Sequence, residues 1–345
     1  MGGRMSGDIR EVERQAAAFR EGFTRIEAEI GKVIVGHREI VRETLLCLFC
    51  GGHVLLEGVP GLGKTLLVKA LARCLDLAFS RIQFTPDLMP ADIIGTNVVV
   101  EDPEGHRQFQ FQRGPLFGQV ILADEVNRAT PKTQSALLEA MQELTVTVGR
   151  IQHPLEHPFF VLATQNPIEM EGTYPLPEAQ LDRFFFKLKV RYPSRAELGE
   201  IVDRTTAAAE GSLTRVLSGP QVEEYKTLVR AVPIASHVRD HVARLTLMTH
   251  PDSPEAPASV RKYVRYGSSP RGAQALVLAG KVVALLANRF HVSVEDIHRV
   301  AYPALRHRLI LSFEGEAEGI DPDTIVGEIL AAAMRGETAS REALA

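Results

Sequence analysis

The sequence contains no tryptophan and only three cysteines among its 345 residues. Without tryptophan, nothing in the composition suggests the aromatic platforms on which single-stranded nucleic acid stacks its bases. Three cysteines cannot all pair with one another, and a small odd number is typical of a reducing compartment. We therefore expect a cytoplasmic protein.

Long apolar runs are also missing. No stretch approaches the ~20 residues of a membrane span, and residues 1–20 are polar and charged, without the apolar core of a signal peptide. Lys and Arg (39) against Asp and Glu (43) give a net charge of −4, which argues against a dedicated nucleic-acid coat but allows a local basic surface. We expect no membrane span and no nucleic-acid partner. By length, the chain suggests two domains of roughly 150 residues each.

Cys47 and Cys50 have the spacing of a metal-binding or redox pair, and Cys74 is the third cysteine. No second pair of ligands accompanies them, and both lie in or next to a helical apolar run, residues 41–49. Free cysteine packs as a small hydrophobic residue. We favour buried core cysteines over a metal or redox site.

Residues 58–65 read G-V-P-G-L-G-K-T, between a short apolar run at 53–57 and helical spacing at 66–75. Strand, glycine-rich loop and helix are the context of a P-loop, whose backbone N–H groups and helix N-terminus hold phosphates. Lys64 would neutralise the β- and γ-phosphates, and the Thr65 hydroxyl would bind Mg²⁺. The alternative is a chance match. The residues assigned to the nucleotide here are Gly58, Pro60, Gly61, Leu62, Gly63, Lys64, Thr65 and Leu66.

Further strands are predicted at residues 80–84, 120–123 and 159–164, separated by helical spacing. From about residue 194 onward the apolar spacing is almost entirely helical. We interpret the chain as an α/β domain with a parallel five-stranded sheet, residues 1–191, followed by an all-helical lid domain, residues 192–345. Two β-hairpins are expected as inserts near residues 96–112 and 144–158, because turn residues separate strand-like segments there. For the first of them, a pair of ordinary sheet strands remains the alternative.

Asp124 ends the apolar run at 120–123, and Glu125 follows it. Parallel sheets place ligand groups at the carboxyl ends of their strands. Asp124 could therefore hold Mg²⁺ through water as a Walker B carboxylate, and Glu125 could activate the attacking water. A surface Asp-Glu pair is the simpler alternative, which the P-loop upstream makes less attractive.

Together these motifs resemble the AAA+ ATPases and, within that superfamily, the MoxR family. The resemblance covers most of the chain, from about Ile34 to the helices after Arg271. Several motifs in this order are more specific than any one alone. Besides the P-loop, they are residues 84–90 (F-T-P-D-L-M-P), 124–129 (D-E-V-N-R-A), 133–141 (T-Q-S-A-L-L-E-A-M), 163–167 (A-T-Q-N-P), 172–184 (G-T-Y-P-L-P-E-A-Q-L-D-R-F) and 269–271 (S-P-R).

The resemblance implies roles for further residues. Val35 and Gly36 look like the segment that borders the adenine, and Asn166 looks like sensor 1, which positions the water or contacts the γ-phosphate. Arg183 resembles the arginine finger and Arg271 resembles sensor 2, which suits the preference of delocalised phosphate charge for arginine. Taken alone, Asn166 would be a turn residue before a proline, and each arginine a solvated surface charge.

In this superfamily the finger reaches the nucleotide of a neighbouring subunit, so the resemblance implies a homo-oligomer, expected to be a hexameric ring, whose monomer binds ATP but hydrolyses it poorly. The hairpins resemble the helix-2 insert and the pre-sensor-1 hairpin. No Aromatic-Val-Gly pore loop is present, which argues against substrate threading.

The MoxR resemblance further implies a chaperone-like ATPase that uses ATP and Mg²⁺ to remodel or activate partner proteins. Such partners often carry a von Willebrand factor A domain, and metal or cofactor insertion is one outcome. Two alternatives stay open at this point. One is a motor subunit of a metal chelatase or of a nucleic-acid remodelling complex. The other is a regulatory module that binds ATP without turnover, against which the intact Glu125, Asn166 and Arg183 count.

Overall fold

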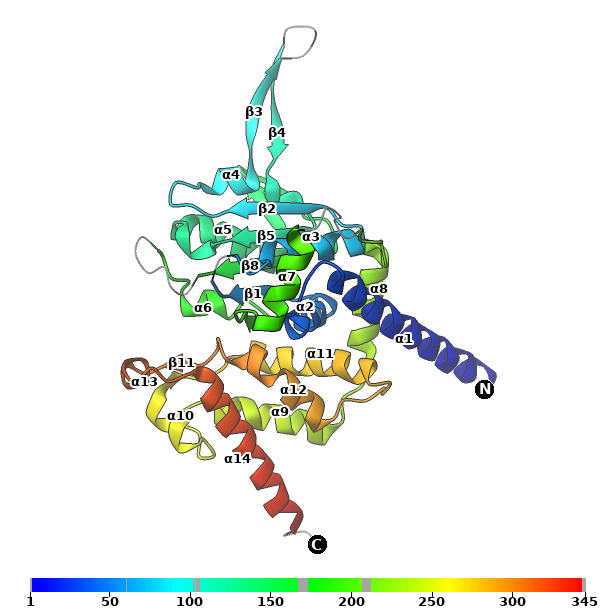
Figure 1. The fold of residues 1–345 in the computed structure, drawn as a ribbon, viewed down its shortest axis with the longest axis vertical. Coiled ribbons are helices and arrows are strands. Elements are labelled where there is room, and N and C mark those ends of the chain that lie inside the picture. Colours follow the sequence, from blue (N-terminus) through cyan, green and yellow to red (C-terminus); the bar gives the residue numbers. More distant parts are fainter. Residues whose placement is uncertain are drawn as a thin grey trace. The chain divides into compact units, whose positions relative to one another are not determined.

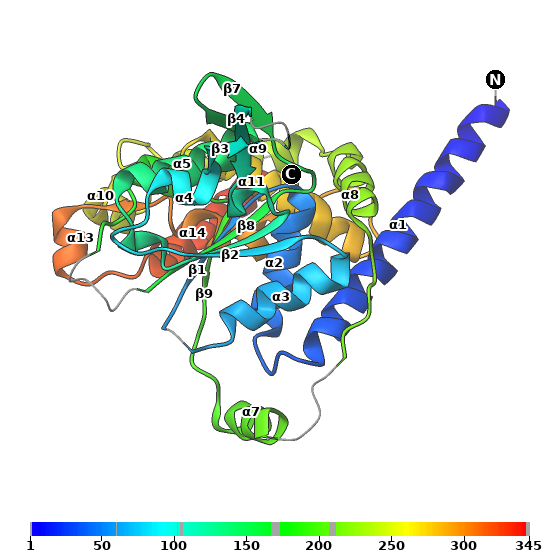
Figure 2. The same cartoon turned by 90° about the horizontal axis from the view of Figure 1, so that it is seen from above.

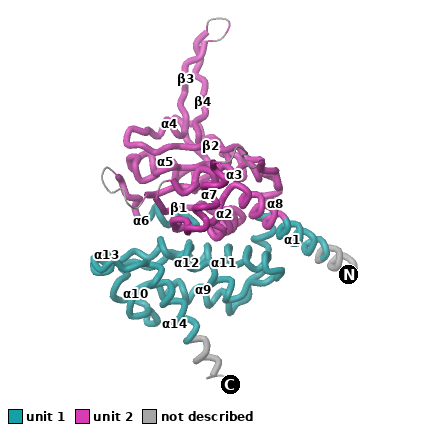
Figure 3. Tube along the Cα trace, viewed as in Figure 1, with its two compact units in different colours: residues 1–21, 178–187, 225–345 teal, residues 22–177, 188–224 magenta. Residues whose placement is uncertain are grey.

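A computed structural model gives the fold and describes residues 2–59, 61–101, 103, 106–166, 173–206 and 212–342. The chain forms two compact units (Figure 3). The sheet unit comprises residues 22–177 and 188–224, and the helical unit comprises residues 1–21, 178–187 and 225–345. Because the chain passes between the units more than once, the domain boundary at residues 191 and 192 stays a proposal.

Five strands form the main sheet, in the order β2-β5-β8-β1-β9. Figure 1 labels β2, β5, β8 and β1 in this order, and Figure 2 labels β9. Strand β2 pairs with β5, β5 with β8 and β8 with β1, all in parallel. This confirms the predicted α/β class and the five-stranded sheet. The strands are β1 (Val54–Glu57), β2 (Phe79–Gln83), β5 (Val120–Asp124), β8 (Phe160–Gln165) and β9 (Phe186–Lys189).

The central strands are almost continuously apolar because helices cover both faces of the sheet. Leu55, Leu122 and Leu162, one on each of β1, β5 and β8, are fully buried. Helix α3 lies on one face, and α4 and α5 lie on the other (Figure 2). The helices in this part of the chain are α1 (Gly2–Gly31), α2 (Arg38–Cys50), α3 (Lys64–Leu75), α4 (Pro90–Ile94), α5 (Pro131–Glu143), α7 (Arg195–Thr206) and α8 (Gly219–Ala231).

Two hairpins form antiparallel sheets of their own, apart from the main sheet. Strands β3 (Gly95–Glu101) and β4 (Arg107–Arg113) make the first, and β6 (Thr145–Val148) and β7 (Ile151–Pro154) make the second. The ring of Phe111 stacks on that of His153 with 4.2 Å between centroids, so the hairpins contact each other. Most of the turn predicted between β3 and β4 lies outside the described residues. Short 3₁₀ turns, η1 (Pro115–Phe117) and η2 (Val126–Arg128), flank β5.

The C-terminal part of the helical unit is α-helical, as expected of a lid, apart from one short antiparallel pair, β10 (Val264–Tyr266) with β11 (Ile310–Leu311). Residues 192–224 of the expected lid belong to the sheet unit. Its helices are α6 (Glu178–Leu181), α9 (Ser236–Met248), α10 (Ala258–Tyr263), α11 (Pro270–Leu286), α12 (Val294–Leu305), α13 (Phe313–Ala317) and α14 (Pro322–Glu342). In the part of the chain that the structure describes, no helix combines the length and apolarity needed to cross a membrane.

The three cysteines are buried and form no disulfide bond, as the favoured interpretation predicts. Cys47 and Cys50 lie on the buried side of α2. Burial, with the negative charge of Glu29, raises the pKa of the Cys74 thiol to about 11. The cysteines are therefore core residues in this fold.

Candidate functional site

The loop between β1 and α3 has the backbone of a phosphate-binding loop. Gly61 and Gly63 have φ values of 84° and 76°, in the left-handed region that favours glycine. A Cβ built on either would meet no atom within 4 Å, so the space beside the loop is open. Gly63 is also the N-cap of α3, and Lys64 is its first residue. Backbone N–H groups at this helix start are therefore available to an anion. The predicted Pro60 lies outside the described residues.

Lys64 is held close to the loop by a hydrogen bond that its Nζ donates to the carbonyl oxygen of Gly58. Burial lowers the pKa of Lys64 below its ordinary value, although Asp124, Glu125 and Glu57 act in the opposite direction. A Cβ on Gly58 would lie 2.9 Å from the carbonyl oxygen of Val190, so only glycine fits at this crossing of two chain segments.

Asp124 and Glu125 stand at the carboxyl end of β5, and Thr164 of the neighbouring strand β8 connects them. The Thr164 hydroxyl donates to Oδ1 of Asp124 at 2.6 Å, and its oxygen accepts the backbone N–H of Glu125 at 2.8 Å. Glu125 has φ 57° and ψ 49°, a left-handed conformation that is uncommon for a residue with a side chain. Such backbone persists where surrounding contacts hold it, often at functional sites.

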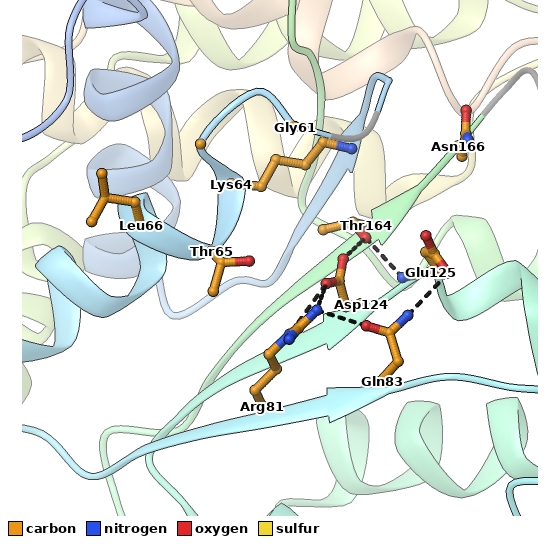
Figure 4. A pocket seen from close by; sticks show the side chains of 11 residues that line it. Gly61, Lys64, Thr65, Leu66, Arg81, Gln83, Asp124, Glu125, Thr164 and Asn166 are labelled. Atoms are coloured by element: carbon orange, nitrogen blue, oxygen red, sulfur yellow. Dashed lines mark hydrogen bonds and ion pairs between the residues drawn. The ribbon is translucent and has the colours of Figure 1, made fainter. Parts of the chain in front are cut away.

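A pair of side chains from β2 contacts the same two carboxylates. Arg81 donates from Nε and Nη2 to Oδ2 of Asp124, at 3.3 and 2.7 Å, and from Nη2 to Oε1 of Gln83 at 2.7 Å. Gln83 in turn donates from Nε2 to Oε2 of Glu125 at 2.9 Å. With Thr164, these bonds close a ring that contains both acidic side chains (Figure 4).

The ring borders a cavity of about 390 Å³ at the carboxyl ends of the strands. Asn166, at the end of β8, is buried and also lines it. The predicted residues that line this cavity are Gly61, Gly63, Lys64, Thr65, Leu66, Asp124, Glu125 and Asn166. Gly58 contributes its carbonyl to Lys64, whereas Leu62 is not among the residues that line the cavity.

Val35 and Gly36 line a different cavity, of about 650 Å³, in the same sheet unit. Its walls come from α1, the segment after it, α2 and α7. Gly36 has φ 68°, and the Glu197 carboxylate lies against the space that a Cβ would fill. The predicted adenine segment therefore lines a cavity that shares no residue with the phosphate-loop cavity.

Asp182 joins the two predicted arginine motifs within the helical unit. Its carboxylate accepts hydrogen bonds from Ser269 Oγ at 2.9 and 2.8 Å, and Ser269 is the N-cap of α11. Arg271, on the first turn of α11, lies 3.7 Å from the same carboxylate. Arg183 follows Asp182 directly, and its backbone N–H donates to Gln180. The segment of the predicted finger and that of the predicted sensor 2 thus belong to one local network.

Arg308 also binds Asp182 and so belongs to this network. The sequence analysis does not predict this role. Its side chain is 2% exposed, and Nε donates to Oδ1 of Asp182 at 2.9 Å. Nη1 and Nη2 donate to the carbonyl oxygens of Asp182, Phe184, Phe185 and Ala304. A buried guanidinium with this many acceptors determines the path of the turn that carries Arg183.

Arg81, Gln83 and Thr164 are further site residues that the sequence did not single out. A signal for the first two was present, because residues two apart on a strand share a face, and polar residues at 81 and 83 flank the buried Ile82. Nothing in the sequence distinguishes Thr164 as a site residue, because a β-branched residue is expected in a buried strand.

Comparisons with known proteins agree with this geometry. A family model described as "ATPase family associated with various cellular activities (AAA)" matches residues 53–186, and an AAA lid domain model matches residues 257–329. The chain is 41% identical over 302 residues to chaperone MoxR1 of Mycobacterium tuberculosis, covering 88% of this chain and 79% of the relative. It is 43% identical over 306 residues to the uncharacterized protein YeaC of Bacillus subtilis, covering 88% and 91%.

A crystal structure from Cytophaga hutchinsonii, described as that of a candidate ATPase, superposes with a TM-score of 0.87 at 41% identity. The match covers 94% of this chain and 98% of that one. Similarity therefore extends over both the sheet unit and the helical unit.

Proposed function

This chain belongs to the MoxR family of AAA+ ATPases, and we propose that it couples ATP hydrolysis to the remodelling or activation of a partner protein. The observation that supports the chemistry best is the hydrogen-bonded ring that places Asp124 and Glu125 beside Lys64 and Thr65 at one cavity. A P-loop alone binds phosphate, whereas hydrolysis also requires a carboxylate for the metal and a group that orients water.

The residues fit Mg²⁺, which we propose as the cofactor that accompanies ATP. Thr65 and Asp124 offer hydroxyl and carboxylate oxygens, the ligands that Mg²⁺ prefers. Among the described residues no group of three His, Cys, Asp or Glu side chains could hold a metal. The remaining ligands would then be phosphate oxygens and water, as is usual for Mg²⁺ with nucleotides. When bound, the ion would neutralise charge on the phosphates.

Each residue of the ring has a proposed task. Lys64 binds the β- and γ-phosphates, and Glu125 accepts a proton from the attacking water. Thr164 fixes the backbone of Glu125 and one oxygen of Asp124. Asn166, at the edge of the cavity, orients the water or contacts the γ-phosphate.

We propose that Val35 and Gly36 border the adenine, with their cavity as the site of the base. Gly58, Pro60, Gly61, Leu62, Gly63 and Leu66 complete the nucleotide-binding segment. Arg183 and Arg271 supply positive charge to the transition state, Arg183 as a finger that reaches a neighbouring subunit and Arg271 as sensor 2.

The finger assignment makes a homo-oligomer, in our proposal a hexameric ring, part of the active enzyme. A closed ring built from one repeated interface lets every subunit contribute its finger to the next site. We propose a partner protein as the substrate of the motor, with a von Willebrand factor A domain as the module expected in it and metal or cofactor insertion as one outcome. We propose a cytoplasmic location, which suits three cysteines that form no disulfide bond.

Phosphate release measured with and without candidate effectors tests this function. The wild-type protein should hydrolyse ATP in the presence of Mg²⁺, and Lys64→Ala should abolish nucleotide binding and hydrolysis together. A partner that carries a von Willebrand factor A domain should stimulate hydrolysis, whereas double-stranded and single-stranded DNA should not. Stimulation by DNA alone would contradict the proposal and favour a nucleic-acid motor.

A further inference from the structure

Arg81 occupies one oxygen of the carboxylate that is proposed to hold the metal. Both of its hydrogen bonds to Asp124 end on Oδ2, and the other oxygen, Oδ1, already accepts the Thr164 hydroxyl. The Asp124 side chain is 18% exposed, so few directions of approach to it remain open. Arg81 also lines the cavity that Lys64 and Thr65 line, as Figure 4 shows.

The register of the sheet explains why the guanidinium reaches this point. In the parallel pair of β2 with β5, Gln83 lies opposite Asp124, and Arg81 lies two residues earlier on the same face. A long arginine side chain spans that offset, with its last nitrogen also bonded to Gln83. The contact is thus set by the register of two adjacent strands, the edge strand β2 and the buried strand β5.

The pair is easily opened in spite of its good geometry. The Arg81 side chain is 47% exposed, and ion pairs of such accessibility contribute little net free energy because water screens them. Arginine also keeps its positive charge under all ordinary conditions. Arg81 therefore neutralises Asp124 in the chain without nucleotide and can leave at small cost.

We propose that Arg81 is a displaceable counter-cation of Asp124, whose guanidinium a divalent cation arriving with the nucleotide replaces. A guanidinium on Oδ2 and a Mg²⁺ ion served by the same carboxylate repel each other, so the two states exclude one another. The inference rests on the proposed function, because it takes Asp124 as the metal carboxylate. Competition of this kind lowers the apparent affinity for Mg²⁺. It also offsets the negative charge of Asp124 and Glu125 when no nucleotide is bound.

Binding of a fluorescent ADP analogue, measured in EDTA and over a series of Mg²⁺ concentrations, tests the inference without requiring turnover. Arg81→Met removes the guanidinium donors and keeps the apolar part of the side chain. Arg81→Gln is a second variant that removes the guanidinium. In both variants, the Mg²⁺ concentration that gives half of the full effect on ADP-analogue binding should be lower by about threefold or more. This is the size expected for loss of one half-exposed ion pair. Arg81→Lys, which keeps a positive charge, should stay near wild type.

Arg128→Met is the matched control. Arg128 is similarly exposed, at 42%, and it pairs with Glu125 rather than Asp124. Its loss should not increase the apparent affinity for Mg²⁺. If Arg81→Met instead weakened ADP binding equally with and without Mg²⁺, Arg81 would be a phosphate contact and the inference would be wrong. Asp124→Asn distinguishes failure of this inference from failure of the proposed metal site. If that variant kept the wild-type Mg²⁺ dependence of ADP binding, Asp124 would not be the metal carboxylate.

Discussion

The hydroxyl of Thr164 lies 2.6 Å from Oδ1 of Asp124 and donates a hydrogen bond to it. The Thr164 hydroxyl oxygen also accepts the backbone N–H of Glu125, so one buried side chain positions both acidic residues. Replacement by valine keeps the shape of the side chain and deletes both interactions.

We predict that Thr164→Val reduces ATP turnover by about 10- to 100-fold, because a misplaced water-activating group is costly. Nucleotide binding should change much less, since the P-loop is untouched. Leaving the Glu125 N–H unpaired should also cost about 1–3 kcal/mol of stability. Thr164→Ser, which keeps the hydroxyl, is the control and should retain most activity. Equal turnover by the valine and serine variants would show that the ring is dispensable.

Arg308 and Asp182 form an ion pair in the helical unit, in which the Arg308 side chain is 2% exposed and the Asp182 side chain 20%. Removing one partner of such a pair leaves an uncompensated charge, which typically costs 3–5 kcal/mol. We therefore expect Asp182→Asn or Arg308→Met to lower the free energy of unfolding by about 3 kcal/mol, as measured by urea denaturation. Arg239→Met changes an exposed arginine of the same unit, 69% exposed beside Asp240, and should have little effect. A loss no larger than that of the control would mean that Arg308 does not anchor the turn before Arg183.

His307 gives the helical unit a predictable response to pH. Burial, together with the nearby charge of Arg308, holds the pKa of His307 well below its usual value of 6.5. Its Nε2 donates to the carbonyl of Phe184, and no described residue hydrogen-bonds to Nδ1, so the ring is neutral in the folded chain.

The unfolded chain protonates this histidine below pH 6.5, and the folded chain does not. The stability that the neutral His307 contributes should therefore be complete above pH 6.5. Below that pH, the free energy of unfolding should decrease by at most about 1.4 kcal/mol per pH unit because of this group. His307→Gln, whose amide N–H can still reach Phe184, should flatten the profile between pH 6.5 and 5. His237→Gln, at an exposed position, should leave the wild-type profile in place. An identical slope in the His307 variant would contradict the assignment.

Much of the fold follows from the sequence because the pattern along the chain reports burial. The P-loop strand, β5 and β8 are predicted within about two residues of their ends, since each is a short apolar run followed by a polar motif. The sequence does not predict where strand β9 lies. Its four residues, Phe186–Lys189, alternate apolar and charged side chains and come almost directly after the motif at residues 172–184. Strands β10 and β11 are too short to show any period.

The site divides in the same way. Lys64, Asp124 and Glu125 belong to compact motifs and were predicted, and the structure places them at one cavity. Thr164, Arg81 and Arg308 act on partners 40, 43 and 126 residues away. Their contacts depend on which strands are neighbours and on how the chain turns, and local patterns do not carry that information.

A mixing experiment tests whether the catalytic site is shared between subunits. Arg183→Ala and Glu125→Gln rings should each be nearly inactive, because every site lacks one component. In a 1:1 mixture of the two variants, about one quarter of sites would combine an intact Glu125 with an intact neighbouring Arg183 if subunits assort randomly. Activity should therefore reappear on mixing. Full activity of Arg183→Ala alone, or no recovery in mixed rings shown to exchange subunits, would argue against a finger supplied by the neighbour.

The central claim is that Glu125 activates water in a site that binds ATP without its help. Turnover and ATP binding by Glu125→Gln, measured on the same preparation, test this claim most directly. The amide keeps the shape of the side chain and cannot accept the proton. We predict that Glu125→Gln retains ATP binding and loses at least about 100-fold in phosphate release, within the range of general-base catalysis. Hydrolysis at the wild-type rate would contradict the account.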